Sequence, residues 1–272
     1  KWIDYDPKED YRITELNYLS SESDYRTMAV SVYTPLQWLS RAPLIGDIAS
    51  NDAASGGENA SDVLALQQID DFTHTPVNNL LTELWQEAYE GINRANYMHQ
   101  YKQANPAGKS IDFAGKEALF GEVYFLRAYY YFHLVRFFGD VPLFEHDLTL
   151  SESKEIARTS QADVLAFVRN ELDAIVDVLP SKAEYSDDDM GRITSGAVVA
   201  FKARTYLYSN DWENVVANCE KLINSTTNGE YALFSSYEGV FLPENEYNDE
   251  VILDLAYVPS LRTWGEYYDY AP

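Results

Sequence analysis

Residues 122–143, EVYFLRAYYYFHLVRFFGDVPL, decide the fold of this chain. Apolar and aromatic side chains recur there at three- and four-residue steps, and further aromatics fill the other sides of the predicted helix. The first set is Tyr124, Ala128, Tyr131, Val135 and Phe138, and the second is Phe125, Tyr129, Phe132 and Phe137. Such a helix must be covered by neighbours on several sides. Gly139 and Pro142 predict its end, because glycine suits a left-handed C-terminal cap and proline cannot continue a helix.

The composition indicates a globular protein with one substantial core. The chain has 272 residues, 46% of them hydrophobic, with a formal net charge of −24 and a pI near 4.3. This charge argues against nucleic acid and anionic membrane surfaces, because binding phosphate requires clustered Lys and Arg. Cys219 is the single cysteine, so neither an internal disulfide nor a cysteine-rich metal site can form. No apolar run of 18 residues or signal region occurs, which by itself indicates a cytoplasmic protein.

Further helices follow from caps, apolar stripes and stop signals. An early helix is expected after Ser23, with a kink or end at Pro35. Thr75 and Pro76 are interpreted as the cap and first residue of the next long helix. Trp85, at helical spacing, is expected in the core. The main predicted helices cover about 77–103, 112–138, 160–179, 194–209 and 212–224.

The last two predicted helices form a hairpin typical of a degenerate tetratricopeptide unit. Small residues on the first helix allow close backbone approach. The second helix is expected to bury Trp212, Val215, Val216, Cys219, Leu222 and Ile223. An ordinary helical hairpin without peptide binding is the interpretation that the sequence favours.

Two regions lack helical periodicity. Residues 46–68 are predicted to form a long polar loop, with room for a short helix after Asp62, and loops of this length in compact proteins often carry function. After Gly229 the pattern becomes extended, and residues 250–257 are predicted to form a β-strand.

The chain resembles the SusD/RagB family, surface glycan-binding lipoproteins of Bacteroidetes. The family signature is close to E-x-x-F-L-R-A-x-x-Y-F-x-L-V-x-x-F-G-D-V-P-L, which residues 122–143 match. Three further segments agree in order: the polar loop from Gly46-Asp47 to Gly56-Gly57, the set Trp85, Tyr89, Ile92, Asn93 and Asn96, and Gly191-Arg192-Ile193-Thr194-x-Gly196-Ala197 running to Asp211-Trp212. The resemblance spans nearly the whole chain.

The resemblance implies a mostly α fold of TPR-like helical hairpins, with long loops and a minor β element near the C-terminus. Residues 1–272 are expected to form a single domain, the N-terminal portion of a longer family member. The implied function is glycan binding and delivery to a TonB-dependent SusC-like transporter at the outer membrane. The implied membrane attachment is an N-terminal lipid anchor that is absent from this chain.

The sequence offers little catalytic chemistry. The histidines, His74, His99, His133 and His146, form no HExxH pair and have no cysteine at metal spacing, and no nucleotide-binding or nucleophile-elbow motif occurs, so neither a metal nor a cofactor is expected. An all-α glycoside hydrolase remains an alternative, with Asp187–Asp189, or Asp47 with Asp52, as candidate carboxylates. A second alternative is a helical-repeat adaptor that binds protein segments.

The ligand site is expected on the loops, because packing already occupies the helix faces. Sugar rings suit aromatic platforms flanked by polar side chains. The candidate residues are Asn51, Asp52, Phe72, His74, Trp264 and Tyr267. For each aromatic residue ordinary packing is the competing interpretation, and Asn51 and Asp52 also suit a turn.

Overall fold

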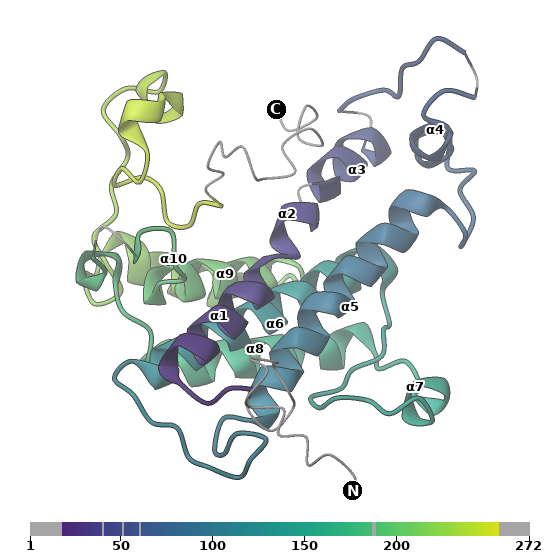
Figure 1. The fold of residues 1–272 in the computed structure, drawn as a ribbon. Coiled ribbons are helices and arrows are strands. Elements are labelled where there is room, and N and C mark those ends of the chain that lie inside the picture. The colour runs from purple at the N-terminus through teal and green to yellow at the C-terminus, as the bar shows by residue number, and fades with distance from the viewer. Residues whose placement is uncertain (1–17, 40, 51, 60, 187–188, 256–272) are drawn as a thin grey trace, which may run out of the picture.

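The computed structural model describes residues 18–39, 41–50, 52–59, 61–186 and 189–255, and this part of the chain is mostly helical (Figure 1). The α-helices are α1 (Glu22–Tyr33), α2 (Leu36–Leu39), α3 (Arg41–Ala49), α4 (Leu64–Asp70), α5 (Asn79–Gln100), α6 (Lys116–Phe138), α7 (Glu152–Glu155), α8 (Gln161–Ile175), α9 (Ser195–Leu207) and α10 (Trp212–Ile223). Short 3-10 turns occupy Lys182–Glu184, Gly239–Phe241 and Pro243–Asn245. The predicted mostly α fold is confirmed. No helix in these described ranges has the length and apolar character needed to cross a membrane.

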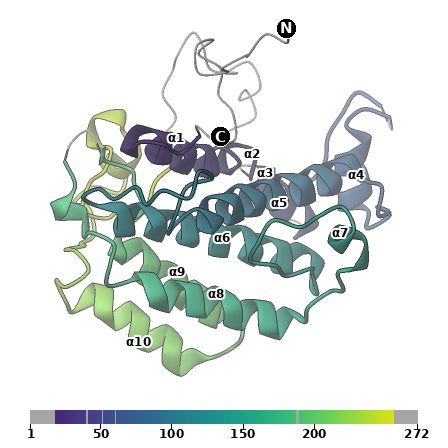
Figure 2. The same cartoon turned by 60° about the horizontal axis from the view of Figure 1, so that its bottom comes forward.

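The signature helix α6 lies at the centre of the molecule. Helices α1 and α5 cover one side of it, α8 and α9 pack against the other, and α10 lies further out (Figure 2). Tyr131 is fully buried, and its hydroxyl donates to the carbonyl of Phe144 at 2.8 Å and accepts from the amide of Phe144 at 3.0 Å. The helix ends at Gly139, with φ of 69°, as the sequence predicts.

Side-chain caps mark where α8, α9 and α10 begin. Ser160, Thr194 and Asp211 accept hydrogen bonds from backbone amides in the first turns of α8, α9 and α10, in agreement with the prediction. The break between α1 and α2 falls at Thr34 and Pro35, where the sequence predicts a kink.

Two predicted helix starts are wrong. The cap of α1 is Ser21 rather than Ser23, because Ser21 and Asp24 form a reciprocal capping box. The cap of α5 is Asn78 rather than Thr75: the Asn78 side chain accepts from the amides of Leu80 and Leu81, so the helix begins after Pro76.

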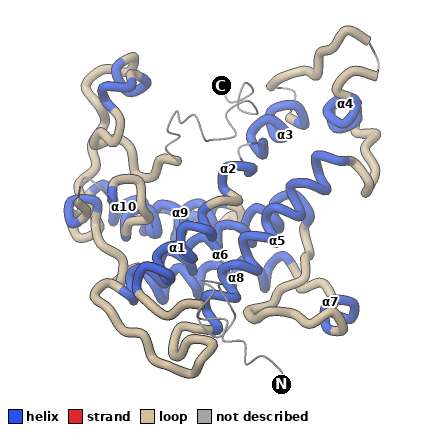
Figure 3. Tube along the Cα trace, viewed as in Figure 1, coloured by secondary structure: helices blue, strands red, loops and turns tan. Residues whose placement is uncertain are grey.

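The polar segment 46–68 is partly helical. Helix α3 continues through Gly46 to Ala49, which corrects the predicted start of the loop, and α4 follows Asp62 as expected. The connection between α3 and α4 projects from the helical body beside the start of α5 (Figure 3).

The β-strand predicted at 250–257 is wrong over its described residues, 250–255, which form no strand. The amide of Ala232 donates to the carbonyl of Asp249 at 3.1 Å, but no ladder continues from it. Lys182 Nζ instead donates to the carbonyls of Asn248 and Val251 at 2.6 and 3.1 Å. The Lys182 side chain therefore occupies backbone carbonyls that a neighbouring strand would otherwise use. Residues 256–257 of the predicted strand lie outside the described part of the chain.

Half of the predicted buried face of α10 is exposed, which corrects the prediction for Trp212, Val216 and Ile223; Val215 and Cys219 are half-buried. Trp212, Val216 and Ile223 are 59%, 55% and 75% exposed, whereas Asn218 and Leu222 are buried. The hydrophobic period is present, but α10 packs on α9 through the Asn218 and Leu222 side.

Burial of Tyr131 generates a stability prediction. Tyr131→Ala is expected to lower the free energy of unfolding by about 3–5 kcal/mol, because it removes a buried ring and both hydrogen bonds to Phe144. Trp212→Ala, at an exposed position, is expected to change it by less than about 1 kcal/mol. Chemical denaturation measures both variants, and a Tyr131→Ala protein as stable as wild type would contradict the packing.

Candidate functional site

A groove of about 820 Å³ lies where α3, the α4–α5 connection, the start of α5 and the end of α6 meet. It is lined by apolar side chains with a few neutral polar groups among them. The lining residues are Ile45, Ala49, Ile69, His74, Thr75, Pro76, Leu81, Thr82, Trp85, Gln86, Phe137 and Phe138.

Aromatic rings from two helices form one wall of the groove. Trp85 of α5 packs edge-on against Phe138 of α6, with ring centroids 5.1 Å apart, and lies 4.9 Å from Tyr89. Trp85 is only partly buried, so it belongs to the groove as well as to the edge of the core. Its helical spacing indicated only the core, because the groove exists only where the start of α5 meets the end of α6.

The polar side of the groove is fixed by the turn after α4. The backbone amides of Thr73 and His74 both donate to the carbonyl of Gln68 at 2.9 Å, and Asn78 Nδ2 donates to the Gln68 side chain at 3.1 Å. His74 therefore stands at the groove on a turn that is tied to both flanking helices. Thr82 and Gln86 add a hydroxyl and an amide from α5.

The other expected site residues lie apart from this lining. Phe72 is 68% exposed on the same turn, held at φ of 53°, a left-handed conformation that is uncommon for a bulky residue. The carboxylate of Asp52 accepts from Ser50 Oγ at 3.2 Å in the loop after α3. Asn51, Trp264 and Tyr267 lie outside the described residues. The structure thus brings His74 to the groove, with Phe72 nearby.

A carboxylate with an altered pKa lies one residue beyond Gln86. Burial raises the pKa of Glu87 to about 7; Arg41 opposes this shift, and Glu83 and Glu90 add to it. Arg41 pairs with Glu83, which ties α3 to α5. Protonation of Glu87 is therefore sensitive to pH near neutrality.

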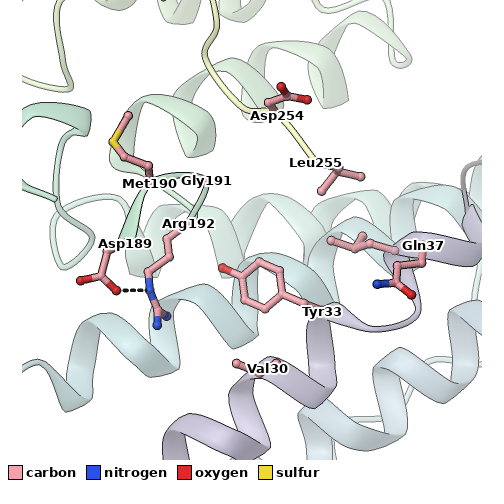
Figure 4. Close-up of a pocket in the computed structure, with 10 residues that line it drawn as sticks. Val30, Tyr33, Gln37, Asp189, Met190, Gly191, Arg192, Asp254 and Leu255 are labelled. Atoms are coloured by element: carbon pink, nitrogen blue, oxygen red, sulfur yellow. Dashed lines mark hydrogen bonds and ion pairs between the residues drawn. The ribbon is translucent and has the colours of Figure 1, made fainter. Parts of the chain in front are cut away.

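A second, smaller pocket of about 300 Å³ lies between α1 and the Asp189–Arg192 turn (Figure 4). Tyr33, Asp189 and Arg192 of its lining are joined to one another through hydrogen bonds and ion pairs that include Glu122. Tyr33 donates to Glu122 at 2.6 Å, and Arg192 pairs with Glu122 at 3.1 Å and with Asp189 at 2.6 Å. Burial raises the pKa of Glu122, while Tyr33 and Arg192 oppose that rise. This network joins α1, α6 and the start of α9, so we interpret it as structural.

The buried Arg127 has a similar role. Its guanidinium pairs with Glu171 of α8 at 2.7 Å and donates to Asn96 of α5 at 2.7 Å, and Asn96 in turn donates to the carbonyl of Phe144. The polar residues of the sequence signature therefore join neighbouring helices. Within the described ranges, no group of three or more His, Cys, Asp or Glu residues could hold a metal ion.

Comparison with known protein families shows to which family this chain belongs. A SusD-like family model, described as "Starch-binding associating with outer membrane", matches residues 1–207. The chain belongs to the SusD-like family. The expectation from the signature is confirmed.

Curated members of the SusD-like family align at low identity. SusD-like protein P25 of Formosa agariphila is 25% identical over 270 residues, covering 96% of this chain and 49% of its own length. A SusD-like protein of Bacteroides ovatus is 27% identical over 206 residues, covering 73% of this chain and 36% of its own length. The chain therefore spans half or less of the length of these relatives.

Solved SusD-like structures share the fold. A laminarin binding SusD-like protein superposes with a TM-score of 0.75 at 27% identity, covering 86% of this chain and 50% of that one. Surface glycan-binding protein A from Bacteroides uniformis gives a TM-score of 0.75 at 25% identity, covering 87% of this chain and 53% of its own.

The pKa of Glu87 predicts how pH affects stability. Because its folded-state pKa of about 7 lies above the ordinary 4.5, the folded protein holds the extra proton between these values, and stability falls as pH rises through this window. Glu87→Gln removes that loss. It is expected to be more stable than wild type by about 1 kcal/mol at pH 8, a value reduced for solvent screening, and equally stable near pH 4.5.

Thermal melts of wild type and Glu87→Gln between pH 4.5 and 8 measure this difference. Glu220→Gln, which removes an exposed carboxylate of α10, is the control for net charge. A constant difference between Glu87→Gln and wild type at every pH would contradict titration of Glu87 in this range.

Proposed function

We propose that this chain binds a glycan in the groove between α3, α5 and the end of α6, and that it does so without catalysis. The observation that supports this most directly is the lining itself, which combines an aromatic wall of Trp85 and Phe138 with the polar groups of His74, Thr82 and Gln86. Sugar rings present an apolar C–H face and a rim of hydroxyls, which this combination suits. Family membership and the laminarin-binding relative support the same ligand class.

The loop residues extend this proposal beyond the groove. Phe72 presents an exposed ring beside His74, and Asp52 lies in the connection that precedes α4. We retain Asn51, Trp264 and Tyr267 as proposed contributors, because each combines a loop position in the sequence with a side chain suited to sugars. Trp264→Ala in a protein of the relatives' length is the corresponding test, and unchanged affinity would remove it from the site.

Binding without hydrolysis is consistent with the chemistry of the groove. No carboxylate belongs to the described lining, whereas a glycosidase requires a pair of carboxylates, one of them with a raised pKa. Among the acids that the sequence offered, Asp189 is bound to Arg192, and hydrogen bonds from Arg192 and Ser186 hold its pKa below the ordinary value. A carboxyl group with that environment is a poor general acid.

The proposed partner is a TonB-dependent SusC-like transporter at the outer membrane, to which the glycan is delivered. The exposed apolar stripe of Trp212, Val216 and Ile223 on α10 supports a protein-binding surface on the scaffold. Capture of such a transporter from the same organism is expected to weaken for Val216→Asp and to persist for Lys221→Gln on the polar side of α10. Equal capture by both variants would contradict this interface.

The groove can be tested by calorimetry with laminarin and starch oligosaccharides. Trp85→Ala is expected to weaken binding by about 1–2 kcal/mol through loss of a stacking surface, and Gln86→Ala by about 1 kcal/mol through loss of a hydrogen bond. Trp212→Ala is the matched tryptophan control and should bind like wild type. Because Trp85 also packs on Phe138, the exposed Gln86 tests the site independently of folding. Equal affinities in all four proteins would place the glycan elsewhere.

Reducing-end assays test whether the protein hydrolyses polysaccharides. Reducing-end assays with the same polysaccharides are expected to stay at background, because the groove supplies no acid and base pair. Sugar release that follows this protein through purification and is lost on replacing a single carboxylate would establish the hydrolase instead.

A further inference from the structure

Arg136 and Arg204 lack the carboxylate partners that five other described arginines have. Pairs with carboxylates are formed by Arg26, Arg41, Arg94, Arg127 and Arg192. Among the residues that the structure describes, no carboxylate lies within 4.0 Å of Arg136 or Arg204. In a chain with a net charge of −24, these two neighbouring arginines form a local positive surface.

Aromatic rings hold Arg136 in place. Its guanidinium carbon lies 5.5 Å from the ring centre of Phe132, 5.4 Å from Phe137 and 5.3 Å from Tyr208. Burial lowers the pKa of Arg136, and the positive charge of Arg204 lowers it further, although the side chain remains a cation. Tyr208 is 46% exposed, so the cluster opens to solvent.

His133 lies beside these arginines and supplies no compensating charge. Its side chain is only 6% exposed, and its Nδ1 atom has no hydrogen-bond partner. Burial and the charges of Arg136 and Arg204 lower the pKa of His133 to about 3, so the imidazole is neutral at physiological pH. The cluster therefore combines two cations with a neutral, unpaired buried group.

The position of the cluster connects it to the groove. Phe137, which packs under Arg136, also lines the 820 Å³ groove. Arg204 lines a separate cavity of about 360 Å³ whose walls include Phe125, Tyr129 and Phe201. Arg136 thus contacts a residue of the groove lining, and Arg204 belongs to the lining of the second cavity.

We propose that Arg136, Arg204 and Tyr208 form an arginine subsite that binds an acidic group of a polysaccharide whose neighbouring rings occupy the groove. The acidic group is a sugar carboxylate or sulfate, because the planar guanidinium donates paired hydrogen bonds to such oxygens. Tyr208 offers a ring surface and a hydroxyl to the same sugar unit. This inference rests on glycan binding in the groove and specifies the ligand as anionic.

The test compares ligands that differ only in charge. Oligogalacturonate and its methyl ester form one pair, and a sulfated galactan and its desulfated form make the other. Wild type is expected to bind the acidic member of one pair at least about tenfold more tightly than the neutral member, as expected for charge-assisted hydrogen bonds. The pair that shows the preference identifies carboxylate or sulfate.

Two variants test whether the preference for the acidic ligand depends on Arg136 and Arg204. Arg136→Gln combined with Arg204→Gln is expected to remove it while leaving binding of the neutral member unchanged. Lys109→Gln, an exposed position in the loop before α6, is the charge control and should keep the preference. Melting temperatures establish that each protein is folded.

The outcomes separate this inference from the proposed function. Equal binding of acidic and neutral members in both pairs, or a preference that survives the double substitution, would overturn the arginine subsite. Binding of laminarin oligosaccharides without binding of either pair would also overturn it, while the glycan-binding groove would stand. Failure of every saccharide to bind would overturn both.

Discussion

The rest of the structure depends on the burial of α6 around its whole circumference. From Leu119 to Phe138 no side chain of this helix is exposed, so α1, α5, α8 and α9 have to surround it. Burial also requires partners for the charged residues Arg127 and Glu122, since an unpaired buried charge is costly. Arg127 therefore binds Glu171 and Asn96, and Glu122 binds Tyr33 and Arg192. These contacts fix how the surrounding helices meet.

Local features of the fold could be predicted from the sequence, whereas features that depend on how helices pack could not. The caps at Ser160, Thr194 and Asp211 act locally, so the sequence predicts them well. The apolar stripe of α10 is equally visible in the sequence, but its period does not state which side faces α9, and Trp212 proved exposed. At α5 the sequence predicts Thr75 as the cap, but the cap is Asn78, because its side chain accepts hydrogen bonds from two backbone amides.

The residues of the candidate site also differ in how far the sequence could predict them. His74 could be found from the sequence, because it stands in a turn between two helical patterns. The part played by Trp85 and Phe138 could not, since it arises only where the beginning of one helix meets the end of another. The charged residues Glu122 and Arg127 are paired inside the fold, whereas the described groove lining contains no carboxylate, lysine or arginine, and the proposed arginine subsite lies beside it.

Glycan binding in the groove at Trp85 can be tested by NMR of the tryptophan indoles. Trp85 and Trp212 lie on α5 and α10, and tryptophan-to-phenylalanine variants assign their N–H signals. Addition of a bound oligosaccharide is predicted to shift the Trp85 signal and leave that of Trp212 unchanged. A shift of the Trp212 signal with an unchanged Trp85 signal would contradict glycan binding in the groove.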